Sequence, residues 1–269
     1  MEIIEVLGFA SALVIGVVLG LIGGGGSILT VPIFVYLMNI NPVTATAYSL
    51  FVVGISALVG TIVNLKKRLV HIRTAIVFSV PAFIAVYLTR KYLVPAIPGY
   101  IFSLEEFILT KEMAIMIFFA AIMILASISM IRNTRKEELP KEKIQYNYVL
   151  ILIEGIIVGV VTGIVGAGGG FLIIPALVLL AKLPMKQAVA TSLLIIASKS
   201  LIGFVGDVQN IAIEWSFLFL FTTISIAGIF LGMYLSNFIQ GKKLEKGFGW
   251  FVLLMGIYII FKEVSYQVL

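Results

Sequence analysis

Two stretches of this chain, 143 residues apart, interrupt apolar runs with nearly the same glycine cluster: GLIGGGGSILTVP at Gly20–Pro32 and GIVGAGGGFLIIP at Gly163–Pro175. An ungapped alignment of residues 16–60 with the residues 143 positions later gives 17 identities in 45 positions. The matches include glycine, proline and serine, not only the apolar residues that any two membrane segments share. The sequence therefore predicts a duplicated unit with one helix break in each copy.

The composition around these breaks is that of an integral membrane protein. The 269 residues are 61% apolar and 12% charged, whereas soluble proteins are about 25% charged. Apolar segments long enough to cross about 30 Å of hydrocarbon fall at 3–22, 43–64, 73–94, 112–131, 147–165, 186–205, 213–238 and 247–262. Two shorter segments, 27–38 and 171–181, each follow a glycine cluster and cover only about 17 Å as helices.

The distribution of charge relates the two copies. The connections 65–73, 132–146, 182–186 and 240–246 hold 14 of the 19 lysines and arginines, and such connections stay on the cytoplasmic side of a membrane. The N-terminus is then outside, the second copy enters from inside, and the copies are inverted. This parity holds whether 27–38 and 171–181 span the membrane or are re-entrant, so both shapes stay open.

The expected fold class is therefore all-α, a polytopic membrane protein with two inverted repeats of about five helical segments each. We expect the first repeat over residues 1–134, a cytoplasmic linker over 135–146 and the second repeat over 147–269. Inverted repeats with broken helices are typical of secondary transporters, in which two equivalent halves exchange roles.

Several other classes of function are disfavoured by the residues present. Cysteine is absent and His71 is the single histidine, so we expect no metal site and no cofactor. An intramembrane enzyme would need a nucleophile and base, or paired carboxylates, at membrane depth, and His71 lies in a basic connection, so we do not expect an enzyme. The basic pI is explained by the cytoplasmic connections, and we expect no nucleic-acid partner.

The glycine clusters have a specific chemistry at membrane depth. A break frees N–H and C=O groups, which hydrocarbon cannot satisfy unless they line a polar cavity. A helix starting at Ser27 or Phe171 would point its N-terminal N–H groups into that cavity and favour an anion. The predicted substrate-binding residues are the glycines and serine at these breaks, Gly24, Gly25, Gly26, Ser27, Gly168, Gly169 and Gly170. The alternative is that the glycines are only helix-packing surfaces.

The segments that follow the breaks, ATAYSLFVVGISALVG at 45–60 and ATSLLIIASKSLIG at 190–203, carry small hydroxyl residues. Ser49 and Ser192 occupy equivalent positions of the repeat, and Thr191 precedes Ser192. All three are predicted hydrogen-bond donors to an oxyanion. The alternative is that each hydroxyl bonds a carbonyl of its own helix.

Lys199 lies inside an apolar segment, where a cation is costly and indicates function. Its repeat counterpart is Ser56, so the repeated fold does not require a charge there. We expect Lys199 to attract the anion; snorkelling, or a structural salt bridge to Glu154 or Asp207, are the alternatives. Glu154 and Asp207 are candidates for proton coupling, against an interfacial role for Glu154 and a solvated loop position for Asp207.

The two glycine clusters, the ATAYSL and ATSLL segments and the basic NLKKRLVHIRTA together resemble the TauE/SafE family of sulfite and organosulfonate exporters. The resemblance implies export of small sulfur-containing or carboxylated anions across the cytoplasmic membrane of a prokaryote. One departure is visible. The glycine-spaced IAGIFLGMYLS at 226–236 corresponds to FIAVYLTRKYL at 83–93, which has Arg90 and Lys91 instead, so we expect looser packing of this helix and a wider outer vestibule.

Together these observations predict a multi-pass secondary transporter of a small anion, such as sulfite, a sulfonate or a related organic oxyanion, working by alternating access. The expected partners are that anionic substrate and the lipid bilayer. A transporter of another small solute, a carboxylate or a cation-coupled metabolite, and an anion channel remain the alternatives. The direction of transport, the coupling ion and the oligomeric state are left open.

Overall fold

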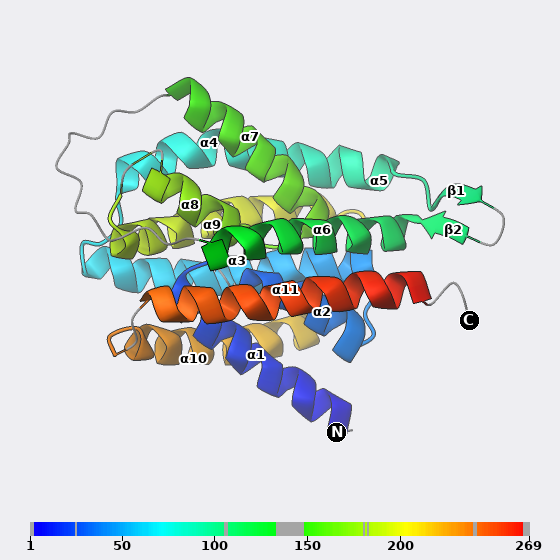
Figure 1. Ribbon diagram of the computed structural model, residues 1–269, viewed down its shortest axis with the longest axis horizontal. Coiled ribbons are helices and arrows are strands. Elements are labelled where there is room, and N and C mark those ends of the chain that lie inside the picture. Colours follow the sequence, from blue (N-terminus) through cyan, green and yellow to red (C-terminus); the bar gives the residue numbers. More distant parts are fainter. Residues whose placement is uncertain are drawn as a thin grey trace.

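The computed structural model describes residues 3–24, 26–104, 107–132, 148–179, 181, 183–238 and 241–265, which form a helical bundle with one small hairpin (Figure 1). The first part of the chain contains α1 (Ile3–Ile22), α2 (Ser27–Pro32), the π-helix η1 (Ile33–Leu37), α3 (Pro42–Lys66), α4 (Ile72–Leu88), the π-helix η2 (Thr89–Leu93), α5 (Val94–Ala96), β1 (Tyr100–Leu104), β2 (Phe107–Thr110) and α6 (Lys111–Arg132). The second part contains α7 (Tyr148–Val165), α8 (Gly170–Leu179), α9 (Met185–Asp207), α10 (Trp215–Leu235) and α11 (Gly241–Ser265).

These elements confirm the all-α polytopic fold class. The predicted long segments coincide with helices, and the short ones are α2 with η1 and α8. The hairpin β1–β2, with Leu104 paired to Phe107 and Ser103 to Ile108, was not predicted. The expected linker 135–146 lies outside the described residues.

Local sequence sets the helix starts. Pro42 occupies the first turn of α3, where no intrahelical N–H donor is needed. The side chain of Asn41 caps the same turn by accepting a hydrogen bond from the Val43 N–H at 2.9 Å. The two short helices begin beside the glycine clusters, α2 at Ser27 as predicted and α8 at Gly170, one residue before the predicted Phe171. Each cluster therefore ends one helix and starts another.

Within the described residues, five helical segments are long and apolar enough to cross a bilayer: Pro42–Lys66, Ile72–Ala96, Lys111–Arg132, Met185–Asp207 and Trp215–Leu235. The long axis of the molecule runs along these helices (Figure 1). The α3–α4 connection and the end of α10 lie at its left end in this view, and α6 ends and α7 begins in its left half. The hairpin β1–β2 and the end of α11 lie toward the right end, and α1 begins at the lower edge, right of the middle.

Helix packing follows the duplicated sequence. α1 packs mainly on α10, and its counterpart α7 packs mainly on α4, the counterpart of α10. The helices that follow the breaks, α3 and α9, pack on each other, as do α6 and α11. In Figure 1 α1 runs from right to left, whereas α7 runs from left to right. Each break is thus held between elements from both halves of the chain.

Glycines allow the paired helices to approach at backbone distance. Gly16 and Gly20 of α1 face Gly228 and Gly232 of α10, and a Cβ at any of the four would overlap the backbone of the partner helix. On the other side, the glycines of α7 face side chains and carbonyls of α4; they are Gly155, Gly159 and Gly163. Such small-residue contacts are how membrane helices gain packing energy without a hydrophobic effect between them.

The expectation of looser packing for the helix that carries Arg90 and Lys91 is wrong. α4 lacks glycines here, but α7 supplies them, so that a Cβ at Gly159 would lie 2.5 Å from the Ala82 carbonyl oxygen. The close approach is preserved because either partner of a helix pair can provide the small residues. Arg90 is fully buried, so this side chain does not line an open vestibule, and the expected widening stays a prediction.

The α1–α10 contact predicts the effect of a single added methyl group. Gly228→Ala places its Cβ against the Leu13 carbonyl oxygen, so we expect a loss of roughly 1–3 kcal/mol of stability from overpacking. The matched control is Gly247→Ala in α11, where a Cβ meets nothing within 4 Å. Thermal unfolding of the purified protein in detergent measures both. Equal midpoints for the two variants would contradict this packing.

Candidate functional site

The two glycine breaks have the same local geometry. α1 and α7 each end at a glycine with positive φ, Gly23 at 79° and Gly166 at 70°, a conformation that side chains with a Cβ rarely adopt. The Gly23 N–H donates to the Leu19 carbonyl at 2.8 Å, and the Gly166 N–H donates to the Thr162 carbonyl at 2.9 Å. After each of these glycines the chain turns sharply and a new helix begins.

The two breaks lie against each other at the centre of the molecule. A Cβ at Gly24 would overlap the backbone of Gly170, and a Cβ at Gly170 would overlap the backbone of Gly24. A Cβ at Gly168 would lie 3.1 Å from the Cβ of Ser27. The predicted breaks therefore share one closed interface in this conformation, and an anion bound between them requires the two backbones to separate.

Each break also packs on the helix that follows the other break. A Cβ at Gly23 would lie 2.7 Å from Val189 Cγ1 and 3.2 Å from Ser192 Oγ on α9. A Cβ at Gly166 would overlap Thr46 on α3. Thr46 and Val189 are equivalent positions of the repeat. The crossed arrangement brings residues of both halves to one place.

All four predicted hydroxyl residues are fully buried, but their hydrogen bonds differ. Ser27 Oγ donates to the Gly24 carbonyl at 2.7 Å, within the first break. Ser192 Oγ donates to the Val189 carbonyl at 2.8 Å, and Thr191 Oγ1 accepts from the His71 N–H at 2.9 Å. Ser49 Oγ has no hydrogen-bond partner among the described residues. The structure therefore leaves Ser49 as a buried donor with free capacity.

Lys199 lies at the second break. Its side chain is fully buried, and its Nζ donates to Thr162 Oγ1 at 2.7 Å. A Cβ at Gly169, where φ is 68°, would lie 2.8 Å from this nitrogen. Snorkelling is therefore excluded. Within the described part of the chain, neither Glu154 nor Asp207 forms a salt bridge with Lys199.

The hydrogen-bonded pair Lys199–Thr162 has no counterpart in the first repeat. In the repeat alignment Thr162 corresponds to Leu19, and Lys199 corresponds to Ser56. Ser56 Oγ donates instead to Ser225 Oγ on α10 at 3.0 Å. The frame of the site is duplicated, whereas its positive charge is not.

The two predicted acidic residues have different surroundings. Glu154 on α7 is half-buried, and its Oε2 is buried without a hydrogen-bond partner among the described residues. The interpretation of Asp207 as a solvated loop residue is wrong: it ends α9, is 3% exposed, and its Oδ2 lies 3.1 Å from Arg90 Nε. Sequence reasoning missed Arg90 as a buried residue because the helix pairing that covers it has no sequence signal.

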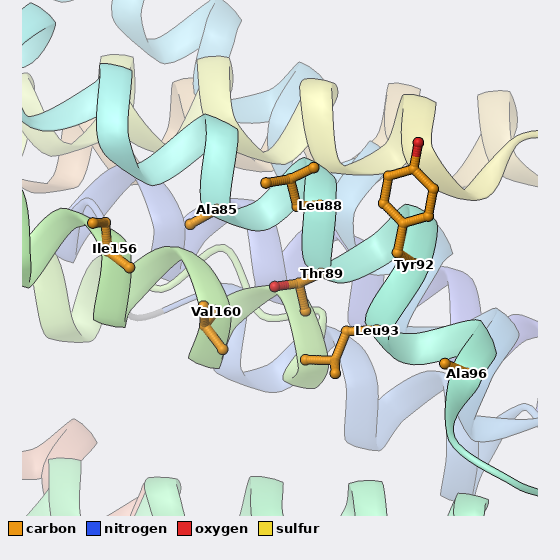
Figure 2. Close-up of a pocket in the computed structure, with 8 residues that line it drawn as sticks. All are labelled: Ala85, Leu88, Thr89, Tyr92, Leu93, Ala96, Ile156 and Val160. Carbon is orange, nitrogen blue, oxygen red and sulfur yellow. The ribbon is translucent and has the colours of Figure 1, made fainter.

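An apolar groove of about 510 Å³ lies between α7 and the α4–η2–α5 segment (Figure 2). Its lining is formed by Ala85, Leu88, Thr89, Tyr92, Leu93, Ala96, Ile156 and Val160. The groove contains none of the predicted site residues and offers almost no polar surface, so it does not match the predicted anion site. Across the described ranges, no group of three or more histidine or acidic side chains is arranged to hold a metal ion.

Comparison with known proteins identifies the family. The model of the family described as sulfite exporter TauE/SafE matches residues 8–259. The chain belongs to the TauE/SafE family. A probable membrane transporter protein of Xylella fastidiosa strain Temecula1 is 27% identical to this TauE/SafE protein over 256 residues, which cover 93% of the chain and 92% of the relative. The probable membrane transporter protein YunE of Bacillus subtilis is 26% identical over 276 residues, with 94% and 96% covered. No solved structure matches.

This TauE/SafE protein is accordingly a membrane transporter. Gly25 lies outside the described residues. At the contact between the breaks the structure brings together Gly24, Gly168, Gly170 and Ser27, with Gly169 against Lys199 and Ser192 beside Gly23. Gly26 packs instead on Ile15 and Leu19 of α1. Ser49 and Thr191 are buried on α3 and α9, and Glu154 and Asp207 lie apart from the breaks, on α7 and at the end of α9. Their roles in binding and coupling stay predictions.

The Lys199–Thr162 hydrogen bond predicts a non-additive pair of substitutions. Thr162→Val leaves a buried ammonium without its partner, and we expect it to cost about 1–3 kcal/mol of stability. In a Lys199→Met background the same change should cost little, because no buried charge remains to be satisfied. Thermal unfolding of the four proteins of this double-mutant cycle measures the coupling. Additive effects would show that the hydrogen bond carries no stability.

Proposed function

We propose that this TauE/SafE transporter moves a small oxyanion, such as sulfite, a sulfonate or a carboxylate, by alternating access through the interface between its two glycine breaks. The observation that carries the proposal is the position of Lys199, whose Nζ lies fully buried against Gly169 with a neutral hydroxyl as partner. A fixed positive charge at a backbone break is suited to hold an anion.

The surroundings of Lys199 support an anionic rather than a cationic substrate. A buried ammonium costs several kcal/mol unless it is paired with a negative charge, and the described residues place no carboxylate on it. An oxyanion that enters beside Lys199 supplies the missing charge. A cationic substrate would instead be repelled at the same position.

The N-terminus of α8 and the hydroxyl of Ser49 add donors to the same place. α8 begins at Gly170 within the interface. The N–H groups of Leu172 and Ile173 already donate to the Gly169 carbonyl, which leaves those of Gly170 and Phe171 at the positive end of the helix, where negative charge is favoured. Ser49 lies one turn after Thr46, the residue that packs on Gly166, and therefore on the same face of α3. Its unpartnered hydroxyl is available to an oxyanion. Ser192 and Ser27 complete the set when the breaks separate.

The packing of the halves supports the transport mechanism. The α1–α10 and α4–α7 pairs are equivalent in the repeat, so moving one pair against the α3–α9 core opens one side, and moving the other pair opens the opposite side. In the present conformation Gly24 and Gly170 are in contact, which corresponds to a closed centre. We place the N-terminus outside, on the strength of the basic connections at the opposite end. Glu154 is the candidate for a coupling proton because its Oε2 is buried without a partner.

Lys199→Met tests this function directly. We expect uptake of radiolabelled sulfite into proteoliposomes to fall at least about tenfold, because the charge that attracts the anion is removed. Lys186→Met, on the same helix but at an exposed position, is the matched control and should keep its rate within about twofold.

Sulfite, methanesulfonate and acetate are compared as competitors in the same assay. Undiminished uptake by Lys199→Met would contradict the role of the lysine. Competition by a cation, with none of the three anions competing, would contradict the anionic substrate class.

A further inference from the structure

A second fully buried cation, Arg90, packs on α9, the helix that carries Lys199. Arg90 sits on the π-helix η2, is 0% exposed, and its Nε lies 3.1 Å from Oδ2 of Asp207. Nη1 and Nη2 of Arg90 have no hydrogen-bond partner among the described residues. The ion pair therefore occupies one edge of the guanidinium and leaves both terminal nitrogens unused. Parallel N–H donors of this kind match the two oxygens of a carboxylate or sulfonate.

Arg90, on η2, packs against the face of α9 on which Lys199 lies. A Cβ at Gly206 would lie 3.1 Å from Arg90 Cβ, and residues 199 and 206 share one helix face because they are seven positions apart. The separation along the axis is about 10 Å. On α7, Gly163 packs on Thr89, next to Arg90, while Thr162 holds Lys199. Both cations thus lie between α7 and α9, Lys199 through its hydrogen bond to Thr162 and Arg90 through η2, which contacts both helices.

The repeated fold does not account for Arg90. The equivalent position of the second half is Met233, inside the uninterrupted helix α10. At Arg90 the helix instead widens into a π-turn, in which the Val94 N–H donates to the Thr89 carbonyl. Pro95 in the following turn removes a backbone donor and disfavours regular α-helix. π-turns of this kind are frequent at functional sites.

We propose that Arg90 is a second anion-binding residue between Lys199 and the hairpin end of the molecule. Its free Nη1 and Nη2 take the two oxygens of the substrate, while Asp207, on Nε, neutralises the guanidinium and repels the substrate, so that the anion is held weakly enough to leave. The inference rests on the proposed function and adds a second anion-binding step to it.

The experiment measures the sulfite concentration for half-maximal uptake into proteoliposomes. Asp207→Asn removes the carboxylate that repels the substrate, so half-saturation should shift to about tenfold lower sulfite. Arg90→Lys keeps the charge and the ion pair but loses the paired terminal donors, so half-saturation should shift to about tenfold higher sulfite. Arg90→Met combined with Asp207→Asn copies the apolar residue of the other half and should behave like Arg90→Lys or worse.

The outcomes separate this second binding residue from the transport function itself. Half-saturation at the wild-type concentration in both Asp207→Asn and Arg90→Lys would overturn the role of Arg90 while leaving the Lys199-dependent uptake standing. Absence of sulfite uptake and of sulfite-dependent thermal stabilisation in the wild type would overturn the proposed function. If Asp207→Asn does not fold, Arg90→Lys alone decides, because it preserves the buried pair.

Discussion

The contact between the backbones of Gly24 and Gly170 is the constraint on which the rest of this structure depends. Neither position tolerates a side chain, and the breaks reach each other only because Gly23, Gly166 and Gly169 adopt positive φ values. α8 begins at Gly170 itself, and α2 begins at Ser27, three residues after Gly24. The contact also buries polar backbone at the centre of the bundle, where protein covers it and lipid does not.

The packing of the two glycine breaks is duplicated, whereas the buried cations beside them are not. The equivalent packing of Gly23 on Val189 and of Gly166 on Thr46 shows that the frame repeats closely. Lys199 and Arg90, in contrast, correspond to Ser56 and Met233. In the proposed mechanism a symmetric frame permits two related conformations, and a single set of cations would give both of them the same anion site. The proposed mechanism needs both properties.

Much of this arrangement was readable from the sequence, because glycine and proline have strong local effects. The break at Gly23–Gly26, the start of α2 at Ser27 and the position of Lys199 inside an apolar helix follow from local patterns. The burial of Arg90 against Asp207 does not, since it depends on how α4 packs on α7 and α9. The glycines that make this packing close lie on α7, so the sequence of α4 alone predicted the opposite. The hairpin β1–β2 lacked any periodic signal over its short strands.

The most direct test of the central claim is whether the closed interface opens during transport. The chain contains no cysteine, so Ser192→Cys introduces a single thiol beside Gly23, at a position that is fully buried in the closed conformation. Ser127→Cys, equally buried on α6, is the control and should stay unreactive. In transporting proteoliposomes, the thiol at 192 should react with a membrane-impermeant reagent, and sulfite should change the rate. A Ser192→Cys protein that transports sulfite yet never reacts from either face would contradict the opening of this interface.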